Sequence, residues 1–283
     1  MNDFLTGLVS VSLGGAIVIL VLAIAARCSR SRYAARWRCW VWLVLSLRLL
    51  FPFPLLPERQ ITPVQIEMPD NAVIFTPGSK PSSDVAPVPH PDKPPQDLNS
   101  HTEEAKSVTL SQTVAILWAM GAMGTAAWAV IAHLRFLAYV RRWGSKVTDV
   151  RIVQTFNALG DMLNLEQRPE MKCCKGLKAP MLAGVFRSVL LLPEENMNGN
   201  ELRYALLHEL THFKRRDIRL KSLCLLARCV HWFNPMVWYM ARLVERDTEL
   251  GCDEAALNYL PAKEHGAYGE TIIHAVERLN AAP

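Results

Sequence analysis

The HELTH motif at residues 208–212 places two imidazoles and a carboxylate on one predicted helix. Because residues i and i+4 share a helix face, His208 and His212 can converge on a single metal ion. Glu209 projects about 100° around the helix axis from His208, beside that ion, where a water-activating base is needed. The motif predicts a zinc peptidase centre. A chance pair of histidines on an amphipathic helix is the alternative that the motif alone leaves open.

A later acidic pair supplies what the motif lacks. A catalytic zinc takes three protein ligands and keeps a fourth position for water. Glu249 is the predicted third ligand, and Asp253, one helical turn further on, can accept the N–H of a metal-bound histidine and fix its orientation. Glu245 and Glu254 are the neighbouring rivals, and a solvated acidic helix face is the alternative interpretation. Asp217, just after the motif, is expected to cap a helix or to support a ligand.

Hydrophobic residues make up 51% of the 283 residues and gather in three long segments, Phe4 to Ala26, Trp37 to Leu56 and Leu110 to Ala132. The first segment has about 23 residues and would span roughly 34 Å as a helix, enough to cross a bilayer. It is unlike a cleavable signal peptide, since it is too long and its positive charge follows it. We therefore expect an integral membrane protein with three spans.

Basic residues flank these segments in a pattern that predicts orientation. They link the first two segments and follow the third: Arg27, Arg30, Arg32, Arg36, Arg38, Arg135, Arg141, Arg142 and Lys146. Short loops rich in Lys and Arg stay cytoplasmic, so the N-terminus is expected outside a bacterial cell membrane and everything after about residue 135 in the cytoplasm. Juxtamembrane residues that meet anionic lipid then explain the net charge of +5, and no direct nucleic-acid binding is expected.

Composition divides the chain into four expected parts. These are two transmembrane helices with a basic cytoplasmic loop (1–56), a Pro-rich extracytoplasmic linker (57–108), a third transmembrane helix (109–140) and a cytoplasmic zinc metallopeptidase domain (141–283) with an amphipathic interfacial helix near 218–240. The seven cysteines all lie outside the linker and are expected to be free thiols.

Inside the last part, the pattern predicts a helix over Val153–Leu165 and short strands over Met171–Cys174 and Val185–Leu192. The strand that ends at Leu192 precedes the HELTH helix. It either offers a free edge to an extended peptide or is fully paired in the core, and the sequence leaves both open.

Several separate segments together resemble the M56 family of membrane metallopeptidases, the antirepressors of the BlaR and MecR type. The matching segments are Pro180–Gly184, Val189–Pro193, His208–Asp217, His231–Pro235 and Glu249–Asp253. The resemblance implies a predominantly α-helical integral membrane protein with a cytoplasmic gluzincin-like α+β zinc metallopeptidase domain. It also implies Zn²⁺ held by His208, His212 and Glu249, with Glu209 as the catalytic base.

In this family an outside signal triggers self-cleavage and the loss of a cytoplasmic repressor. The implied partners are the lipid bilayer, a cytoplasmic protein substrate such as a BlaI- or MecI-like repressor and, as an open alternative, a second copy of the chain. Family sensors of β-lactams continue into a further membrane helix and an outside penicillin-binding domain with a Ser-x-x-Lys nucleophile. This chain stops at Pro283 and contains no Ser-x-x-Lys, so β-lactam sensing is not assigned to it.

Rival functions are separated by particular residues. A catalytically silent zinc-binding signalling scaffold has no use for Glu209 as a base and would close the fourth position of its zinc. A housekeeping membrane protein-processing peptidase is a second alternative. The metzincin pattern fails because Arg215 and Ile218 stand where it requires Gly and His. Charged residues around the motif disfavour a site-2-type intramembrane protease.

Overall fold

The computed structural model describes residues 2–28, 35–51, 109–185, 187–194, 197 and 199–280. The chain divides into two compact units, and the described residues belong to the unit formed by Met1–Phe53 with Thr109–Pro283. The expected linker at 57–108 and most of the basic link between the first two apolar segments lie outside the described residues.

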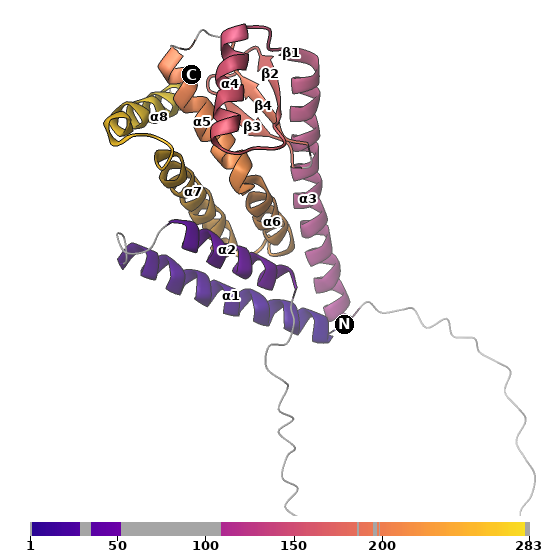
Figure 1. Cartoon of the computed structure of the whole chain (residues 1–283). Coiled ribbons are helices and arrows are strands. Elements are labelled where there is room, and N and C mark those ends of the chain that lie inside the picture. Colours follow the sequence, from indigo (N-terminus) through magenta and orange to yellow (C-terminus); the bar gives the residue numbers. More distant parts are fainter. Residues whose placement is uncertain are drawn as a thin grey trace, which may run out of the picture. The chain divides into compact units, whose positions relative to one another are not determined.

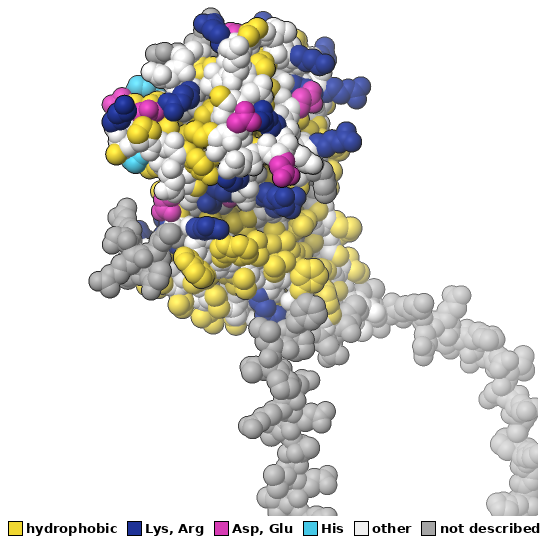
Figure 2. Space-filling model, viewed as in Figure 1, with side chains coloured by type: hydrophobic (Ala, Val, Ile, Leu, Met, Phe, Trp, Pro, Cys, Tyr) yellow, Lys and Arg dark blue, Asp and Glu magenta, His cyan; other side chains and the backbone are white. Residues whose placement is uncertain are grey.

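Three apolar helices precede the rest of the fold: α1 (Asn2–Cys28), α2 (Ala35–Leu50) and α3 (Leu110–Trp143). By length and composition, α1 and α3 are candidate membrane spans. The second expected span coincides with α2, whose 16 residues measure about 24 Å, less than the roughly 30 Å hydrocarbon core. Residues 52–56 of that expected span lie outside the described residues. Figure 2 shows the hydrophobic surface that these elements contribute to the lower part of the described unit.

The segment near 218–240 forms two helices, α6 (Asp217–Val230) and α7 (Pro235–Leu257), which replace the single interfacial helix expected there. Asn234 caps α7 and Pro235 begins it, a combination that starts a new helix. Both helices pack against α2 (Figure 1), and His231 and Asn234 of the turn between them are buried. There, His231 Nε2 lies 3.0 Å from the Leu49 carbonyl of α2. Helices α6 and α7 therefore pack inside the described unit, against α2.

The remaining elements form a small α+β layer. They are β1 (Gly144–Lys146), α4 (Val150–Met162), β2 (Glu170–Cys174), β3 (Met181–Ala183), β4 (Val189–Leu192), α5 (Gly199–Arg215), the 3-10 turn η1 (Ala262–Glu264) and α8 (His265–Asn280). The strand order is β1-β2-β4-β3, with β2 and β4 parallel and the two outer pairs antiparallel. Strand β4 is paired on both sides, and the edges of the sheet are β1 and β3.

Helix α5 is held in place by an apolar core. Its buried side chains Leu206, Leu207 and Leu210 pack with Leu190 of β4 and with apolar residues of α4 and α8. Burying such a side chain stabilises the fold by about 1.5–3 kcal/mol. Helix α5 also contacts α7, and His208 and His212 of the motif meet Glu249 of α7 there, which places the candidate site between α5 and α7.

Candidate metal centre

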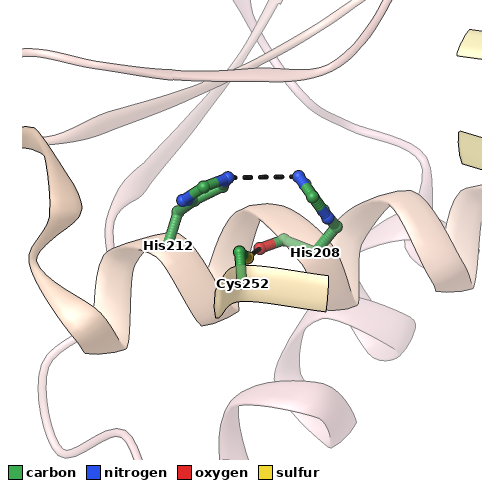
Figure 3. Close-up of side chains that lie close together, drawn as sticks. All are labelled: His208, His212 and Cys252. Atoms are coloured by element: carbon green, nitrogen blue, oxygen red, sulfur yellow. Dashed lines mark hydrogen bonds between the residues drawn. The ribbon is translucent and has the colours of Figure 1, made fainter. Parts of the chain in front are cut away.

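His208 and His212 point towards one another from successive turns of α5 (Figure 3). Their Nε2 atoms lie 3.1 Å apart. Glu249 of α7 joins them, with its Oε2 3.2 Å from His212 Nε2 and 3.5 Å from His208 Nε2. The structure thus brings together all three residues that the sequence proposed as ligands.

The hydrogen bonds on the far sides of both rings assign their tautomers. His212 Nδ1 lies 2.8 Å from Asp217 Oδ2, and His208 Nδ1 lies 3.2 Å from Asp253 Oδ1. An ionised carboxylate only accepts hydrogen bonds, so each Nδ1 carries a proton, and in the neutral, metal-binding form of each ring Nε2 presents the lone pair. Two imidazole lone pairs and a carboxylate oxygen therefore converge. Such a set of acceptors requires a cation among them.

The donor set fits zinc. Ligand atoms placed about 2.0–2.1 Å from a tetrahedral ion are about 3.3 Å from one another. The three separations here run from 3.1 to 3.5 Å. Two neutral histidines and one carboxylate also match a common catalytic zinc set with an open fourth position.

The electrostatics of the site favour positive charge. Burial alone would lower the pKa of His212, but its hydrogen bonds to Asp217, Cys252 and Glu249 outweigh burial and raise the pKa to about 11. For Glu249, burial would raise the pKa, yet the hydrogen bonds with His208 and His212 and the charges of His212 and Lys221 lower it. A proton or a metal ion can each supply the charge that these groups stabilise.

Lys221 of α6 is a site residue that sequence reasoning missed. Its Nζ lies 2.9 Å from Glu249 Oε1, the oxygen that does not face the histidines. Lys221 therefore binds one oxygen of the Glu249 carboxylate, and the other oxygen faces the histidines and can bind an ion. Nothing in the spacing of the sequence connects Lys221 with Glu249, because they come from different helices.

Tyr268 of α8 was also missed. Its Oη lies 2.9 Å from His208 Nδ1 and donates a 2.8 Å hydrogen bond to Asp253 Oδ1. Tyrosine, aspartate and histidine form a closed triangle that fixes the His208 ring. Because this triangle lies on the Nδ1 side of the ring, Tyr268 orients the histidine and does not reach the Nε2 side.

Cys252 offers a second donor set with the same two histidines. Ligand atoms of His208, His212 and Cys252 all lie within 4.8 Å of one another. The Sγ atom, however, donates a 3.3 Å hydrogen bond to the His208 carbonyl (Figure 3). Only a protonated thiol can donate in this way, whereas a metal ligand would be a thiolate. Glu249 gives the tighter set, and Cys252 is a buried thiol beside it.

Glu209 lies beside the histidines and next to the free strand edge. Burial raises the pKa of its carboxyl group, while the charges of His208 and His212 and a hydrogen bond from the Leu182 N–H of β3 lower it. The candidate base therefore bridges the metal-ligand cluster and the edge strand. A raised pKa suits a group that must both accept and return a proton.

Comparison of the sequence with known proteins identifies a family and several relatives of this chain. A sequence model of the family described as "BlaR1 peptidase M56" matches residues 6–282. The regulatory protein BlaR1 of Bacillus licheniformis is 27% identical over 180 residues, which cover 63% of this chain and 30% of that protein. The methicillin resistance mecR1 protein of Staphylococcus aureus is 36% identical over 97 residues, which cover 33% of this chain and 17% of that protein. The chain thus spans less than a third of these relatives.

Proposed function

The chain belongs to the BlaR1 peptidase M56 family, and we propose that it is a membrane-bound zinc endopeptidase of signal transduction. The observation that carries this proposal is the convergence of His208 Nε2, His212 Nε2 and Glu249 Oε2 within 3.1 to 3.5 Å, with Glu209 beside them. A structural zinc site would have no need of the glutamate and would close its fourth position. The catalytically silent scaffold is therefore the weaker alternative.

The residues of the chain divide the chemistry among them. A zinc ion held by His208, His212 and Glu249 would polarise a peptide carbonyl and lower the pKa of a water molecule, so that the water gives up a proton more easily. Glu209 accepts the proton of the attacking water and returns it to the leaving amine. Asp217 and Asp253 hold the two ligand histidines in the tautomer that leaves Nε2 free. Lys221 keeps one oxygen of Glu249 occupied, so that the other faces the ion.

Strand β3 is the proposed guide for the substrate backbone. It forms one edge of the sheet, and its Leu182 N–H contacts the Glu209 carboxylate. An extended peptide that added to this edge would run past the catalytic base, with main-chain hydrogen bonds for affinity and side chains for selection. Of the two alternatives left open for the strand before the HELTH helix, β4 takes the fully paired one.

The proposed substrate is the chain itself or a cytoplasmic repressor of the BlaI or MecI type. The names of the relatives, a regulatory protein and a methicillin resistance protein, support this class. The proposal requires the metal centre to face the cytoplasm and the N-terminus to lie outside. A membrane-impermeant thiol reagent applied to intact cells should label a Lys93→Cys variant and leave an exposed Lys178→Cys variant unlabelled; the reverse result would overturn this orientation.

Co-expression tests the function itself. The chain is produced with the regulator encoded beside it, as wild type and as Glu209→Ala, and both proteins are followed by immunoblotting. We expect cleavage of the regulator or of the chain in the wild type alone. Equal cleavage with the Glu209→Ala variant would reject the peptidase assignment.

A further inference from the structure

A cavity of about 750 Å³ lies between the first turns of α2, the α5–α6 junction and the second half of α7. Five of its lining residues are cationic: Arg36, Lys214, Arg215, Arg216 and Arg219. Only Asp217 and Glu254 are acidic. The cavity therefore carries a marked excess of positive charge.

Both acidic residues are already engaged. Asp217 is buried and bonds His212 at 2.8 Å and Arg215 Nε at 3.0 Å. Glu254 accepts the backbone N–H of Ala35 at 3.0 Å and so caps the start of α2. Neither carboxylate forms an ion pair with Arg36, Arg216 or Arg219 among the described residues. Charge neutralisation of the cavity must come from elsewhere.

Three arginines are left over. Arg36, Arg216 and Arg219 are exposed and have no ion pair among the described residues. Lys214 is occupied by the Leu163 carbonyl and the Tyr259 hydroxyl, both at 2.8 Å. The sequence from residue 4 to residue 57 contains no Asp or Glu, so the first two apolar segments and their link cannot supply an acid.

The cationic cavity has two neighbouring cavities with which it is linked by shared lining residues of α2. Its walls include Trp40 and Leu43. A second cavity of about 440 Å³ is lined by Arg36, Trp37 and Trp40. Trp37 also lines a third cavity, of about 530 Å³, between α1 and α2. The other residues that line it are mainly apolar: Leu22, Ala25, Ala26, Arg38, Val41 and Trp42. The two shared indoles are 69% and 57% exposed, which is typical of the boundary between lipid and water.

The surface agrees with such a boundary. Figure 2 shows Lys and Arg side chains where the hydrophobic surface of the lower part gives way to the polar surface above it. Juxtamembrane basic pockets of this kind select anionic headgroups, and arginine pairs with phosphate through two parallel hydrogen bonds.

We propose that this cavity binds an anionic phospholipid. The phosphate lies among Arg36, Arg216 and Arg219, and an acyl chain follows the third cavity, between α1 and α2. The adjoining indoles and this third cavity favour a lipid over a soluble phosphate, which would use only the cationic end. The inference does not depend on peptidase activity, and its failure would leave the proposed function untouched.

The test uses the full chain in micelles and lipids with brominated acyl chains, which quench nearby tryptophans. Brominated phosphatidylglycerol should quench at lower mole fraction than brominated phosphatidylcholine with the same chains. Arg216→Gln/Arg219→Gln should weaken the binding of phosphatidylglycerol by roughly 30-fold, at about one kilocalorie per mole for each arginine near the surface. Arg36→Gln, on the opposite wall, should weaken it about fivefold.

The matched control removes the same charge elsewhere. Arg141→Gln/Arg142→Gln lies on the exposed end of α3 and should leave the affinity within about twofold, because exposed charges are screened over a short distance. Equal losses in both double variants would show diffuse attraction to the surface and overturn the site. Displacement of the brominated lipid by water-soluble glycerophosphoglycerol at equal concentration would show a soluble-anion site, and would also contradict the proposal.

Discussion

Asp247 of α7 accepts a 2.8 Å hydrogen bond from Trp42 Nε1 of α2, and its side chain is fully buried. Arg38 of α2 pairs with the same carboxylate at 3.2 Å. Asp247 stands two residues before Glu249, so the apolar helix α2 is bonded to the helix that supplies the third candidate ligand. Glu254, which caps α2, strengthens the same junction. The junction therefore fixes α2 against the helix that carries the third candidate ligand.

This junction predicts a large loss of stability on truncation. Asp247→Ala leaves the Arg38 charge and the Trp42 N–H without their shared partner, and should lower the free energy of unfolding by about 3–5 kcal/mol. Trp42→Phe should cost less, about 1–3 kcal/mol for an unsatisfied buried acceptor. Thermal unfolding in micelles measures both. Trp128→Phe, at an exposed tryptophan of α3, is the control, and an equal loss there would refute the special role of the junction.

The choice between Glu249 and Cys252 as third ligand has a direct test. Glu249→Gln should weaken zinc binding strongly, since a neutral amide replaces the carboxylate that closes the cluster. Cys252→Ser should retain one equivalent of zinc, because the thiol donates to a backbone carbonyl. Metal analysis of the two purified variants distinguishes the sets. Loss of zinc from Cys252→Ser with retention by Glu249→Gln would transfer the ligand role to the cysteine.

The supporting aspartates should tune the affinity without abolishing binding. Asp217→Asn and Asp253→Asn each leave a partner of similar shape at a histidine Nδ1, but remove the charge. We expect zinc affinity to fall about 10–100-fold for each, as is usual for such partners of ligand histidines. Competition with a chelator of known affinity measures the change. Unaltered affinity in both variants would contradict the tautomer assignment.

The affinity should also depend on pH. The raised pKa of His212, about 11 without metal, means that zinc must displace a proton at neutral pH. Each released proton makes binding about tenfold tighter per pH unit, so affinity should rise from pH 6 to pH 8. In the metal-free protein the sign is opposite. Stabilisation by the protonated histidine is complete below its unfolded pKa of about 6.5 and is lost as pH rises towards 11. A pH-independent zinc affinity would contradict this account.

The HELTH residues and the later pair at Glu249 and Asp253 could be placed from the sequence because helical periodicity fixes which side chains share a face. The structure brings these residues together between α5 and α7. Lys221 and Tyr268 could not be found in this way, since each arrives from another helix and no spacing rule relates it to the motif. Strands β1 and β3 have three residues each, too few to show an alternating pattern.

Asp217 illustrates a further limit. Five positions from His212, it would lie off the metal-facing side of a continuous helix. The backbone of Arg216 adopts the left-handed region, with φ 59°, and separates α5 from α6. The chain therefore turns between the two helices and brings Asp217 Oδ2 to within 2.8 Å of His212 Nδ1. A single left-handed residue of this kind leaves no trace in hydrophobic periodicity.

The most direct measurement is the comparison of wild type with Glu209→Gln, purified in the same micelles, for zinc content and for cleavage of the repressor or of the chain itself. The amide keeps the shape of the side chain but cannot take up a proton. We predict one equivalent of zinc in both proteins and a cleavage rate lower by about 10²–10⁴-fold in the variant. Cleavage at the wild-type rate by zinc-loaded Glu209→Gln would contradict the account.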